Sequence, residues 1–362
     1  RLERLEHFER FELFEAYEGN AMAKDLRSFL KEIETEEPDQ VLRVTREVDP
    51  HFEVTGVLAR LEKERKFPIV IFEKVKGSAL PVVTNVHADA RRLFRAIGLK
   101  DGTLPQFIRE YSAREDSPKP PLIVKEAPVQ EVVLAGNDVD VTRLPILTYH
   151  EKDAGRYITA GFGIMRDPDS GVLNASYQRM QVKSGTRCGM YIQFRHLMQI
   201  HQKNVAKGRP TEIAVICGMD TAVRLASATW GANIPLDLDE FAIAGGLRGE
   251  PLEMVRCETV DVDVPADAEI VIEGVILPDV LEPEGPMAEF TGVYGDTEPK
   301  HVFEARCITM REDAIYHDIL PFGNEHLLLL GLPYEGVLYR YVKAVIPGLH
   351  DDLIAAVEQH EG

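Results

Sequence analysis

Apolar residues near the start of the chain recur at the spacing of an amphipathic helix, i, i+3, i+4 and i+7. Asp25 precedes this run as a helix cap, and a short β-type run and a second helical run follow. The predicted elements are a helix with Leu26, Phe29, Leu30 and Ile33 on its apolar face, a strand at Pro68–Phe72, and a helix at Ala88–Ile97 that ends at Gly98. This order indicates a small α/β domain.

From Val132 onward, short β-type runs dominate the pattern and two helical stretches separate them. The strands are predicted at Tyr157–Met165, Glu212–Cys217, Glu269–Ile276 and Val302–Met310, and the helices at Tyr191–Lys207 and Thr221–Ala228. Strands interrupted by separate helices are typical of an α+β domain built on a barrel or sandwich. The sequence contains no GxGxxG after a strand and no P-loop, so a Rossmann-type nucleotide site has no support.

Proline and glycine divide the chain further. The proline-rich residues Asp116–Pro128 predict a domain boundary, and a helix at Glu335–Val345 is expected to end at Pro347-Gly348. The last residues, LHDDLIAAVEQHEG, are expected to form another amphipathic helix, and Leu327–Leu332 a core segment. We set aside residues 1–21 as a leader and expect an N-terminal domain at 22–128, a central domain at 129–320, and a connecting helix with the start of a C-terminal α/β domain at 321–362.

The formal charge of −19, from 60 acidic and 41 basic residues, argues against nucleic-acid binding and anionic membranes. No apolar run approaches the roughly 20 residues that cross a bilayer, so membrane insertion is not expected. The four cysteines are widely spaced and form no CxxC pair, which argues against a zinc cluster or a disulfide framework. We therefore expect a cytoplasmic protein.

The segment Pro283–Gly292, PEGPMAEFTG, holds two carboxylates five residues apart around a Gly-Pro turn. Proline fixes φ and lacks an N–H, so this segment is expected to be a bent loop that directs Glu284 and Glu289 at one point. Two acids held close together cannot both remain ionised at low cost, and one of them can keep a proton at neutral pH as a general acid. The alternative is an acidic surface turn.

Asn174 and Arg179 share the segment NASYQRM. Residues five apart in an extended strand point to opposite faces, so a turn or bulge is needed to bring both to one pocket. The planar fork of arginine binds both oxygens of a carboxylate, which makes Arg179 a candidate for holding an acidic substrate. The alternative is a solvated surface arginine.

His196 stands at a predicted helix start, and Glu240 opens the segment DEFAIAGGLRG. With Asn174 they would supply two oxygen ligands and one imidazole, a mixture that suits Mn²⁺ or Mg²⁺. The alternative for His196 is a partly buried, hydrogen-bonded side chain. His201, five residues on, does not share its helical face and is not expected to take part.

NASYQRM, His196, DEFAIAGGLRG, PEGPMAEFTG and REDAIYH occur in the order and rough spacing of the UbiD family of prenylated-FMN-dependent (de)carboxylases, which the chain resembles from about Asp25 to Pro347. The resemblance implies a central split β-barrel of the flavin-binding type and reversible decarboxylation of an aromatic, heteroaromatic or α,β-unsaturated acid. It also implies a flavin prenyltransferase as the supplier of the cofactor, and a homodimer or higher homo-oligomer.

The resemblance further implies a set of site residues. Prenylated FMN would be held with Mn²⁺ and a neighbouring K⁺. The manganese ligands would be Asn174, His196 and Glu240. The cofactor-binding residues would be Ser176, Tyr177, Gln178, Arg179, Ile192, Gln193, Phe194 and His196. The catalytic set would be Arg179, Glu284 and Glu289, with Arg179 positioning the carboxylate or pairing with Glu284, and Glu289 donating the proton.

Two departures and two alternatives accompany this resemblance. Family members are usually longer, with a third domain that carries a cofactor-contacting lysine, and here the pattern ceases near Gly348. We expect either a truncated chain or a tail joined across a missing stretch. ATWGANIP (Ala228–Pro235) stands where the family places potassium contacts.

The alternatives are an oxidoreductase that uses unmodified FMN and a non-catalytic subunit of a carboxylase complex, but neither explains the retained acids. Phe322, Leu327–Leu330 and Tyr334 predict an apolar wall for a flat acid.

Overall fold

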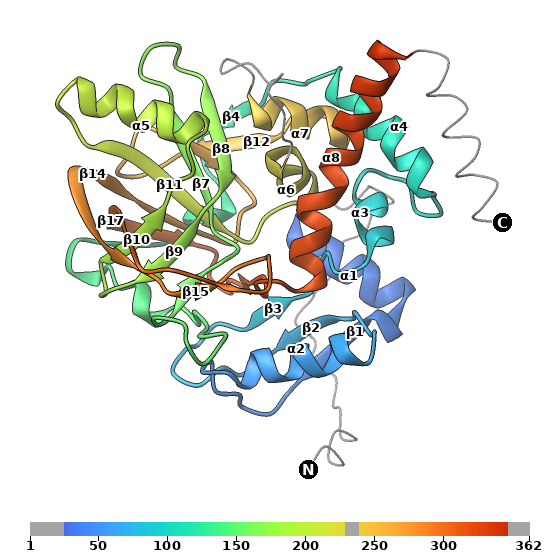
Figure 1. The fold of residues 1–362 in the computed structure, drawn as a ribbon, viewed down its shortest axis with the longest axis horizontal. Helices are drawn as coiled ribbons and strands as arrows, with labels where there is room; N and C mark the ends of the chain where they lie inside the picture. The colour runs from blue at the N-terminus through green and yellow to red at the C-terminus, as the bar shows by residue number, and fades with distance from the viewer. Residues whose placement is uncertain (1–24, 229–238, 347–362) are drawn as a thin grey trace.

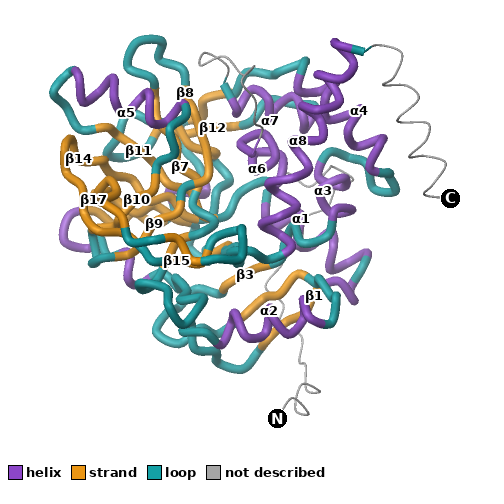
Figure 2. The backbone as a smooth tube through the Cα atoms, in the orientation of Figure 1, coloured by secondary structure: helices purple, strands orange, loops and turns teal. Residues whose placement is uncertain are grey.

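The computed structural model describes residues 25–228 and 239–346, with strands gathered on one side of the molecule and most helices on the other (Figures 1 and 2). The fold is α+β, as the pattern of apolar residues predicts. An N-terminal α/β part lies beside a strongly curled sheet that forms a half-barrel. The expected leader (1–21), the potassium-contact segment after Ala228 and the terminal helix after Pro347 lie outside the described residues.

The N-terminal part begins with helix α1 (Leu26–Glu36), whose first turn is capped by Asp25. The Asp25 carboxylate accepts a hydrogen bond from the backbone N–H of Ser28 at 2.7 Å. The apolar face predicted for this helix is buried. The other elements of this part are β1 (Val41–Val44), α2 (Glu53–Lys63), β2 (Ile69–Phe72), β3 (Val82–Thr84), α3 (Ala90–Ala96) and α4 (Leu104–Glu115). Its sheet has the order β1-β2-β3-β18, so the late strand β18 (Tyr316–His317) completes it.

The central sheet has nine strands, all paired antiparallel, in the order β6-β9-β10-β17-β14-β11-β7-β8, with β5 also paired to β17. The strands are β5 (Val132–Ala135), β6 (Tyr157–Ile158), β7 (Phe162–Arg166), β8 (Leu173–Tyr177), β9 (Arg179–Val182), β10 (Arg187–Tyr191), β11 (Thr211–Cys217), β14 (Ile270–Glu284) and β17 (Glu298–Met310). The two longest strands, β14 and β17, shift register after Glu273 and again between Ile276 and Leu281. Such bulges bend a sheet. Gly274 is required at the first bulge, because a Cβ there would lie 2.1 Å from the carbonyl oxygen of Glu304.

Helices α5 (His196–Ala206), α6 (Thr221–Ala228) and α7 (Glu240–Arg248) pack around this sheet. The remaining short elements are the sheet of β4 (Leu122–Val124), β12 (Glu253–Arg256) and β13 (Asp263–Pro265), the pair β15 (Met287–Ala288) and β16 (Tyr294–Gly295), and the 3₁₀ turns Pro38–Gln40, Pro128–Gln130, Gly136–Asp138 and Val141–Arg143. None of the helices in the described ranges is long and apolar enough to cross a membrane.

Helix α8 (Asn324–Val345) packs against α4 and α6 and is twice the length that the sequence predicts. The predicted helix at Glu335–Val345 is confirmed, including its end, but it starts earlier, at Asn324, because Pro333 lies inside the helix and does not interrupt it. The prediction of Leu327–Leu332 as a core segment was wrong for half of its positions. Leu329 and Leu332 are buried, but Leu327 and Leu330 are exposed, since only one face of the helix meets the core.

Other helix boundaries also differ from the prediction. Helix α5 begins at His196 and not at Tyr191, because Tyr191 still pairs with Arg179 in the sheet. Helices α2, α4 and α7 were not predicted. For α4 a signal was available, since Thr103 and Gln106 form a capping box at its start.

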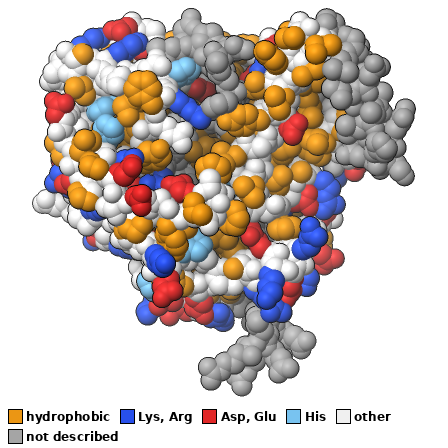
Figure 3. Space-filling view, viewed as in Figure 1, with side chains coloured by type: hydrophobic (Ala, Val, Ile, Leu, Met, Phe, Trp, Pro, Cys, Tyr) orange, Lys and Arg blue, Asp and Glu red, His pale blue; other side chains and the backbone are white. Residues whose placement is uncertain are grey.

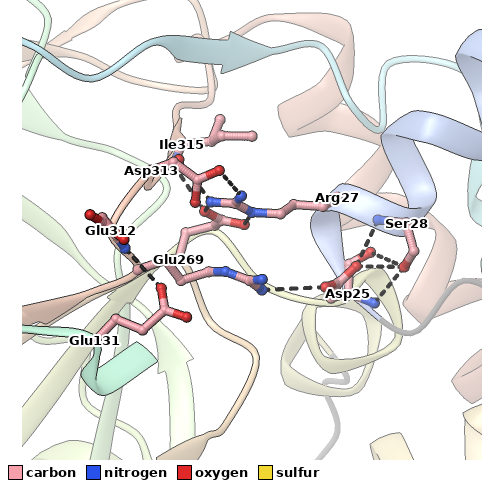
Figure 4. A network of polar contacts seen from close by, with 9 residues as sticks. Asp25, Arg27, Ser28, Glu131, Glu269, Glu312, Asp313 and Ile315 are labelled. Carbon is pink, nitrogen blue, oxygen red and sulfur yellow. Dashed lines mark hydrogen bonds and ion pairs between the residues drawn. The ribbon is translucent and has the colours of Figure 1, made fainter. Parts of the chain in front are cut away.

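A polar network joins α1 to the central sheet (Figure 4). The guanidinium of Arg27 donates to both oxygens of the buried Glu269, at 2.8 and 2.9 Å, and to Asp313 at 2.6 Å. Arg311 reaches Asp25 at 3.4 Å. Because these residues come from opposite ends of the chain, the network fixes the N-terminal helix against the β14–β17 region.

Candidate active site

Arg179 lies at the first position of β9, directly after a one-residue break between β8 and β9. At the break, the Gln178 N–H donates to the carbonyl of Gly161 at 2.8 Å. The Arg179 side chain contacts both acids of PEGPMAEFTG: Nε and Nη2 donate to the two oxygens of Glu284, at 3.1 and 2.5 Å, and Nη1 pairs with Glu289. The break is the irregularity that the spacing of Asn174 and Arg179 requires.

The two acids reach Arg179 through a bent segment. Glu284 is the last residue of β14, the Gly285-Pro286 peptide bond is cis, and Glu289 follows β15. Gly285 has φ +91°, and a Cβ there would lie 2.8 Å from the carbonyl oxygen of Asp296, so no other residue fits without a shift of the backbone. The prediction that this segment is a bent loop directing both carboxylates at one point is confirmed.

The two carboxylates differ in their surroundings. The side chain of Glu284 is 0% exposed and that of Glu289 is 33% exposed. Burial alone would lower the pKa of Arg179, but its hydrogen bonds to Glu284 raise it, so the guanidinium stays charged. The same carboxylate, together with burial, raises the pKa of Tyr157. Glu284 is therefore held by Arg179 in the interior, whereas Glu289 is the acid that solvent or a ligand can reach.

Asn174, His196 and Glu240 meet at a second point, although they come from β8, α5 and α7. The Asn174 amide nitrogen lies 3.3 Å from His196 Nδ1 and 2.5 Å from Glu240 Oε1. The nitrogen and oxygen of an amide are interchangeable by a flip, so the same position can present an oxygen ligand. Burial lowers the pKa of His196 and raises that of Glu240 to about 8. A cation between them would reverse the second shift by stabilising the ionised carboxylate.

The residues expected to line a cofactor lie between these two points or beside them. Gln178 donates to Ser176 Oγ at 2.9 Å, and its buried Oε1 has no hydrogen-bond partner among the described residues. Ile192 is buried, whereas Gln193 and Phe194 are exposed. The Tyr177 ring packs edge-on against Phe162, so its hydroxyl is turned into the protein. Extended chain from Asn174 to Arg179 spans at most about 17 Å.

Several neighbours of the acids were not found from the sequence. Gln181 accepts a hydrogen bond from the N–H of Gly285 at 3.3 Å, and Lys183 donates to the carbonyl of Pro283 at 2.7 Å. The ring of His326 faces that of Phe290, next to Glu289, with centroids 6.2 Å apart. No local pattern marks these residues, because they reach the loop from the end of β9 and from α8, far away in the sequence. His201 is buried, and its Nδ1 lies 2.8 Å from Thr211 Oγ1.

Behind Arg179 lies a buried hydrogen-bonded group. The Tyr149 hydroxyl lies 2.7 Å from each oxygen of Asp318 and 2.7 Å from Thr159 Oγ1. Thr159 follows Ile158, which pairs with Met180, so this group touches the strand next to Arg179. Burial raises the pKa of Asp318 to about 8. A protonated Asp318 can both accept from Tyr149 and donate back to it.

Comparison with known proteins identifies the family. Residues 122–324 match the UbiD domain described as the 3-octaprenyl-4-hydroxybenzoate carboxy-lyase Rift-related domain. Residues 34–111 match the N-terminal domain of the same family. A curated relative, the anhydromevalonate phosphate decarboxylase of Methanothermobacter thermautotrophicus, is 37% identical over 322 residues, which cover 89% of this chain and 72% of the relative.

Solved structures agree. The UbiD-class enzyme HmfF from Pelotomaculum thermopropionicum, in an evolved dimeric form in complex with prFMN, is 42% identical with a TM-score of 0.83, over 90% of this chain and 74% of HmfF. The vanillic acid decarboxylase of Sedimentibacter hydroxybenzoicus is 31% identical with a TM-score of 0.82, over 90% and 70% of the two chains. These matches confirm the resemblance seen in the sequence motifs: the chain belongs to the UbiD family of carboxy-lyases.

Proposed function

We propose that this chain catalyses the reversible decarboxylation of an aromatic, heteroaromatic or α,β-unsaturated carboxylic acid with prenylated FMN. The observation that carries the proposal is the joining of Arg179 to two carboxylates of unequal burial, Glu284 and Glu289. A hydride-transferring flavoprotein has no need of such a trio. The relatives named as decarboxylases of vanillic acid and of anhydromevalonate phosphate support this range of acids.

The residues present fit the cofactor. Asn174, His196 and Glu240 offer an oxygen, a nitrogen and a carboxylate at one point, the donor set for Mn²⁺, and the metal would hold the cofactor phosphate against an acidic protein. Ser176, Gln178, Ile192, Gln193 and Phe194 would line the flavin, with the unpartnered Gln178 Oε1 free for it. Tyr177 would contribute its backbone. A neighbouring K⁺ completes the proposed set, and the cofactor supplies the electron sink that decarboxylation requires.

The geometry gives the two acids separate tasks. Glu284 accepts hydrogen bonds from Nε and Nη2 of Arg179, and Glu289 binds the remaining nitrogen, Nη1. A substrate carboxylate that approaches Arg179 competes with Glu289 for this nitrogen. Glu289, released from its ion pair, is then the acid within reach of the substrate that can deliver a proton to carbon. Glu284 keeps Arg179 charged and oriented throughout.

The surface beside the acids favours a flat apolar substrate. Phe290, Val293, Phe322, Leu327 and Leu330 are all exposed. Phe322 lies close to the loop, since a Cβ on Gly292 would touch its ring at 3.4 Å. Figure 3 shows apolar side chains gathered over the region of α8. An apolar rim beside the partly buried Arg179 suits a planar acid with one carboxylate. The prediction of an apolar wall at Phe322 and Leu327–Leu330 remains part of this proposal.

The test is purification after co-expression with a flavin prenyltransferase, followed by the absorbance spectrum of the bound flavin. Carbon dioxide release and deuterium exchange would then be measured over a panel of aromatic, heteroaromatic and acrylic acids. We expect a modified flavin and exchange with at least one acid. A preparation that binds only unmodified FMN, or a loaded protein that exchanges none of the panel, would contradict the proposal. We also expect a cytoplasmic homo-oligomer.

A further inference from the structure

Arg224, on α6, is a buried cation with no acidic partner among the described residues. Its side chain is 0% exposed, and Nε, Nη1 and Nη2 find no hydrogen-bond acceptor in the described part of the chain. Its nearest aromatic neighbour is Tyr177, whose ring centroid lies 5.9 Å from the guanidinium carbon. A guanidinium carries five N–H donors in a fixed plane and cannot shed its charge. Buried charges are normally paired, and the described part of the chain provides no acceptor for the Arg224 guanidinium.

Two other unpartnered polar atoms belong to the surroundings of Arg224. The Tyr177 hydroxyl and His317 Nδ1 are both buried and neither makes a hydrogen bond of normal geometry among the described residues, although the hydroxyl interacts with the charge of Arg224. Burial, with the nearby charge of Arg224, lowers the pKa of His317 to about 3, so this imidazole is neutral. Its Nε2 lies 3.4 Å from Glu325 Oε1. An ionised carboxylate accepts only, so Nε2 carries the hydrogen and Nδ1 is an acceptor that needs a donor.

The acids nearby do not neutralise Arg224. Glu325 is occupied by other donors: the backbone N–H groups of Asn85 and His87, at 2.8 and 2.9 Å, and the two imidazoles of His87 and His317. Burial alone would raise the pKa of Glu325, but its histidine bonds bring it below its usual range, so it stays ionised without touching Arg224. The other nearby acid, Asp318, has its pKa raised to about 8 by burial and bonds to Tyr149.

The same cluster has the composition of a metal site, because ligand atoms of His87, His317 and Glu325 lie within 4.8 Å of one another. The charge of Arg224 opposes a cation at this place, and it acts on both imidazoles. Glu325 is also saturated by its four donors. The guanidinium of Arg224 requires hydrogen-bond acceptors, and His317 Nδ1 requires one hydrogen-bond donor. A single ligand meets both requirements if it is an anion that carries a hydroxyl group.

We propose that Arg224, Tyr177 and His317 form a binding site for bicarbonate. Bicarbonate is planar and singly charged. Two of its oxygens match the fork of the guanidinium, its O–H can donate to His317 Nδ1, and the Tyr177 hydroxyl can donate to a remaining lone pair. The two oxygens of formate or acetate can also bind the guanidinium of Arg224, but neither anion has an O–H that could donate to His317. Chloride has neither a pair of oxygens nor an O–H.

The site is separate from Arg179, Glu284 and Glu289, and the inference goes beyond the proposed reaction. Bicarbonate is the hydrated form of the carbon dioxide that a carboxy-lyase releases, so the ligand is present wherever the enzyme works. Binding is tested without turnover and without cofactor. Loss of activity in the panel of acids would therefore leave this inference standing, and absence of bicarbonate binding would leave the decarboxylase proposal standing.

The experiment is thermal unfolding of the purified chain in increasing bicarbonate at constant pH and ionic strength, with sodium sulfate as the balancing salt. For the wild type we expect a saturable rise in Tm of about 3 °C. Arg224→Met should remove the rise, and Tyr177→Phe should weaken the apparent affinity several-fold. Arg60→Met, at an exposed arginine paired with Glu64, is the matched control and should keep the full rise. Formate, tested at the same concentrations, should bind the wild type with less than a tenth of the apparent affinity of bicarbonate.

A wild type that does not respond to bicarbonate, or an Arg224→Met variant that responds equally, would overturn the site; either result would mean that water alone solvates the guanidinium. An equal, Arg224-dependent response to formate would overturn the assignment of bicarbonate. If Arg224→Met does not fold, Arg224→Lys keeps the charge without the fork and should lose the response. Carbon-13 bicarbonate in NMR then supplies the direct readout on the wild type: a bound signal supports the site, and none overturns it.

Discussion

Arg179 and Glu284 form a two-bonded ion pair across 105 residues of sequence, with Nε 3.1 Å from Oε1 and Nη2 2.5 Å from Oε2. The carboxylate is fully buried, whereas Glu289, on the third nitrogen, is partly exposed. Glu284 therefore orients Arg179, whereas Glu289 does not. The effects of removing the two acids should differ accordingly.

Glu284→Gln should lower both stability and activity. The variant keeps the shape of the side chain but leaves the partly buried Arg179 without its main counter-charge, which costs about 3 kcal/mol in the free energy of unfolding. Urea unfolding at neutral pH measures this loss. Glu298→Gln, at an exposed carboxylate paired with Lys300, is the control and should leave stability unchanged. Equal stability of the two variants would show that Arg179 does not depend on Glu284.

Glu289→Gln should abolish turnover and deuterium exchange while the protein keeps its fold and its flavin. The amide can still accept from Arg179 Nη1 but has no proton to deliver to carbon. The measurements are exchange into the substrate and the absorbance spectrum of the purified protein. Glu282→Gln, in the neighbouring pair with Arg187, should behave as the wild type. Exchange at the wild-type rate in Glu289→Gln would rule out Glu289 as the acid.

Glu240→Gln should release the metal and, with it, most of the flavin. Glu240 would be the one ligand of the proposed set that brings a negative charge to the cation. Elemental analysis for manganese and the flavin absorbance after gel filtration measure the two losses, and dialysis of the wild type against EDTA should reproduce them. Glu253→Gln, at an exposed position of β12, is the control. Retention of both manganese and flavin in Glu240→Gln would remove Glu240 from the metal site.

Asp318 should make the protein less stable as the pH rises from about 4 to about 8. Burial raises the pKa of folded Asp318 to about 8, so the folded chain keeps a proton that the unfolded chain has lost. Over this window the group lowers the free energy of unfolding by up to about 1.4 kcal/mol for each pH unit. Asp318→Asn should remove this contribution, and the exposed Asp101→Asn should not. Parallel pH profiles of Asp318→Asn and the wild type would contradict the assignment.

Gly285→Ala should destabilise the acid loop more than a positive φ alone explains. Gly285 combines φ +91° with a Cβ position 2.8 Å from the carbonyl oxygen of Asp296. Gly77 has a similar φ of +82° and nothing within 4 Å, so Gly77→Ala measures the backbone strain by itself, about 1–2 kcal/mol. Thermal unfolding of the two variants separates the effects. A smaller loss in Gly285→Ala would mean that the loop relaxes freely.

The sequence by itself determined the local features of this protein and its family. The 3.6-residue period predicted the buried face of α1, and the Gly-Pro pair predicted the bend that lets Glu284 and Glu289 converge. Five motifs in register identified the UbiD family before any contact was known. These features follow from short-range rules, because a helical period or a glycine-proline turn acts within a few residues.

Only the tertiary structure decided which of these residues meet and how deeply they are buried. The inclusion of Pro333 within α8 and the burial of Arg224 have no local signal, since each depends on segments that lie far apart in the chain. Burial sets the electrostatic character of a charge, and burial is a property of the packed molecule. The same glutamate or arginine is a surface ion or a site residue according to what folds against it.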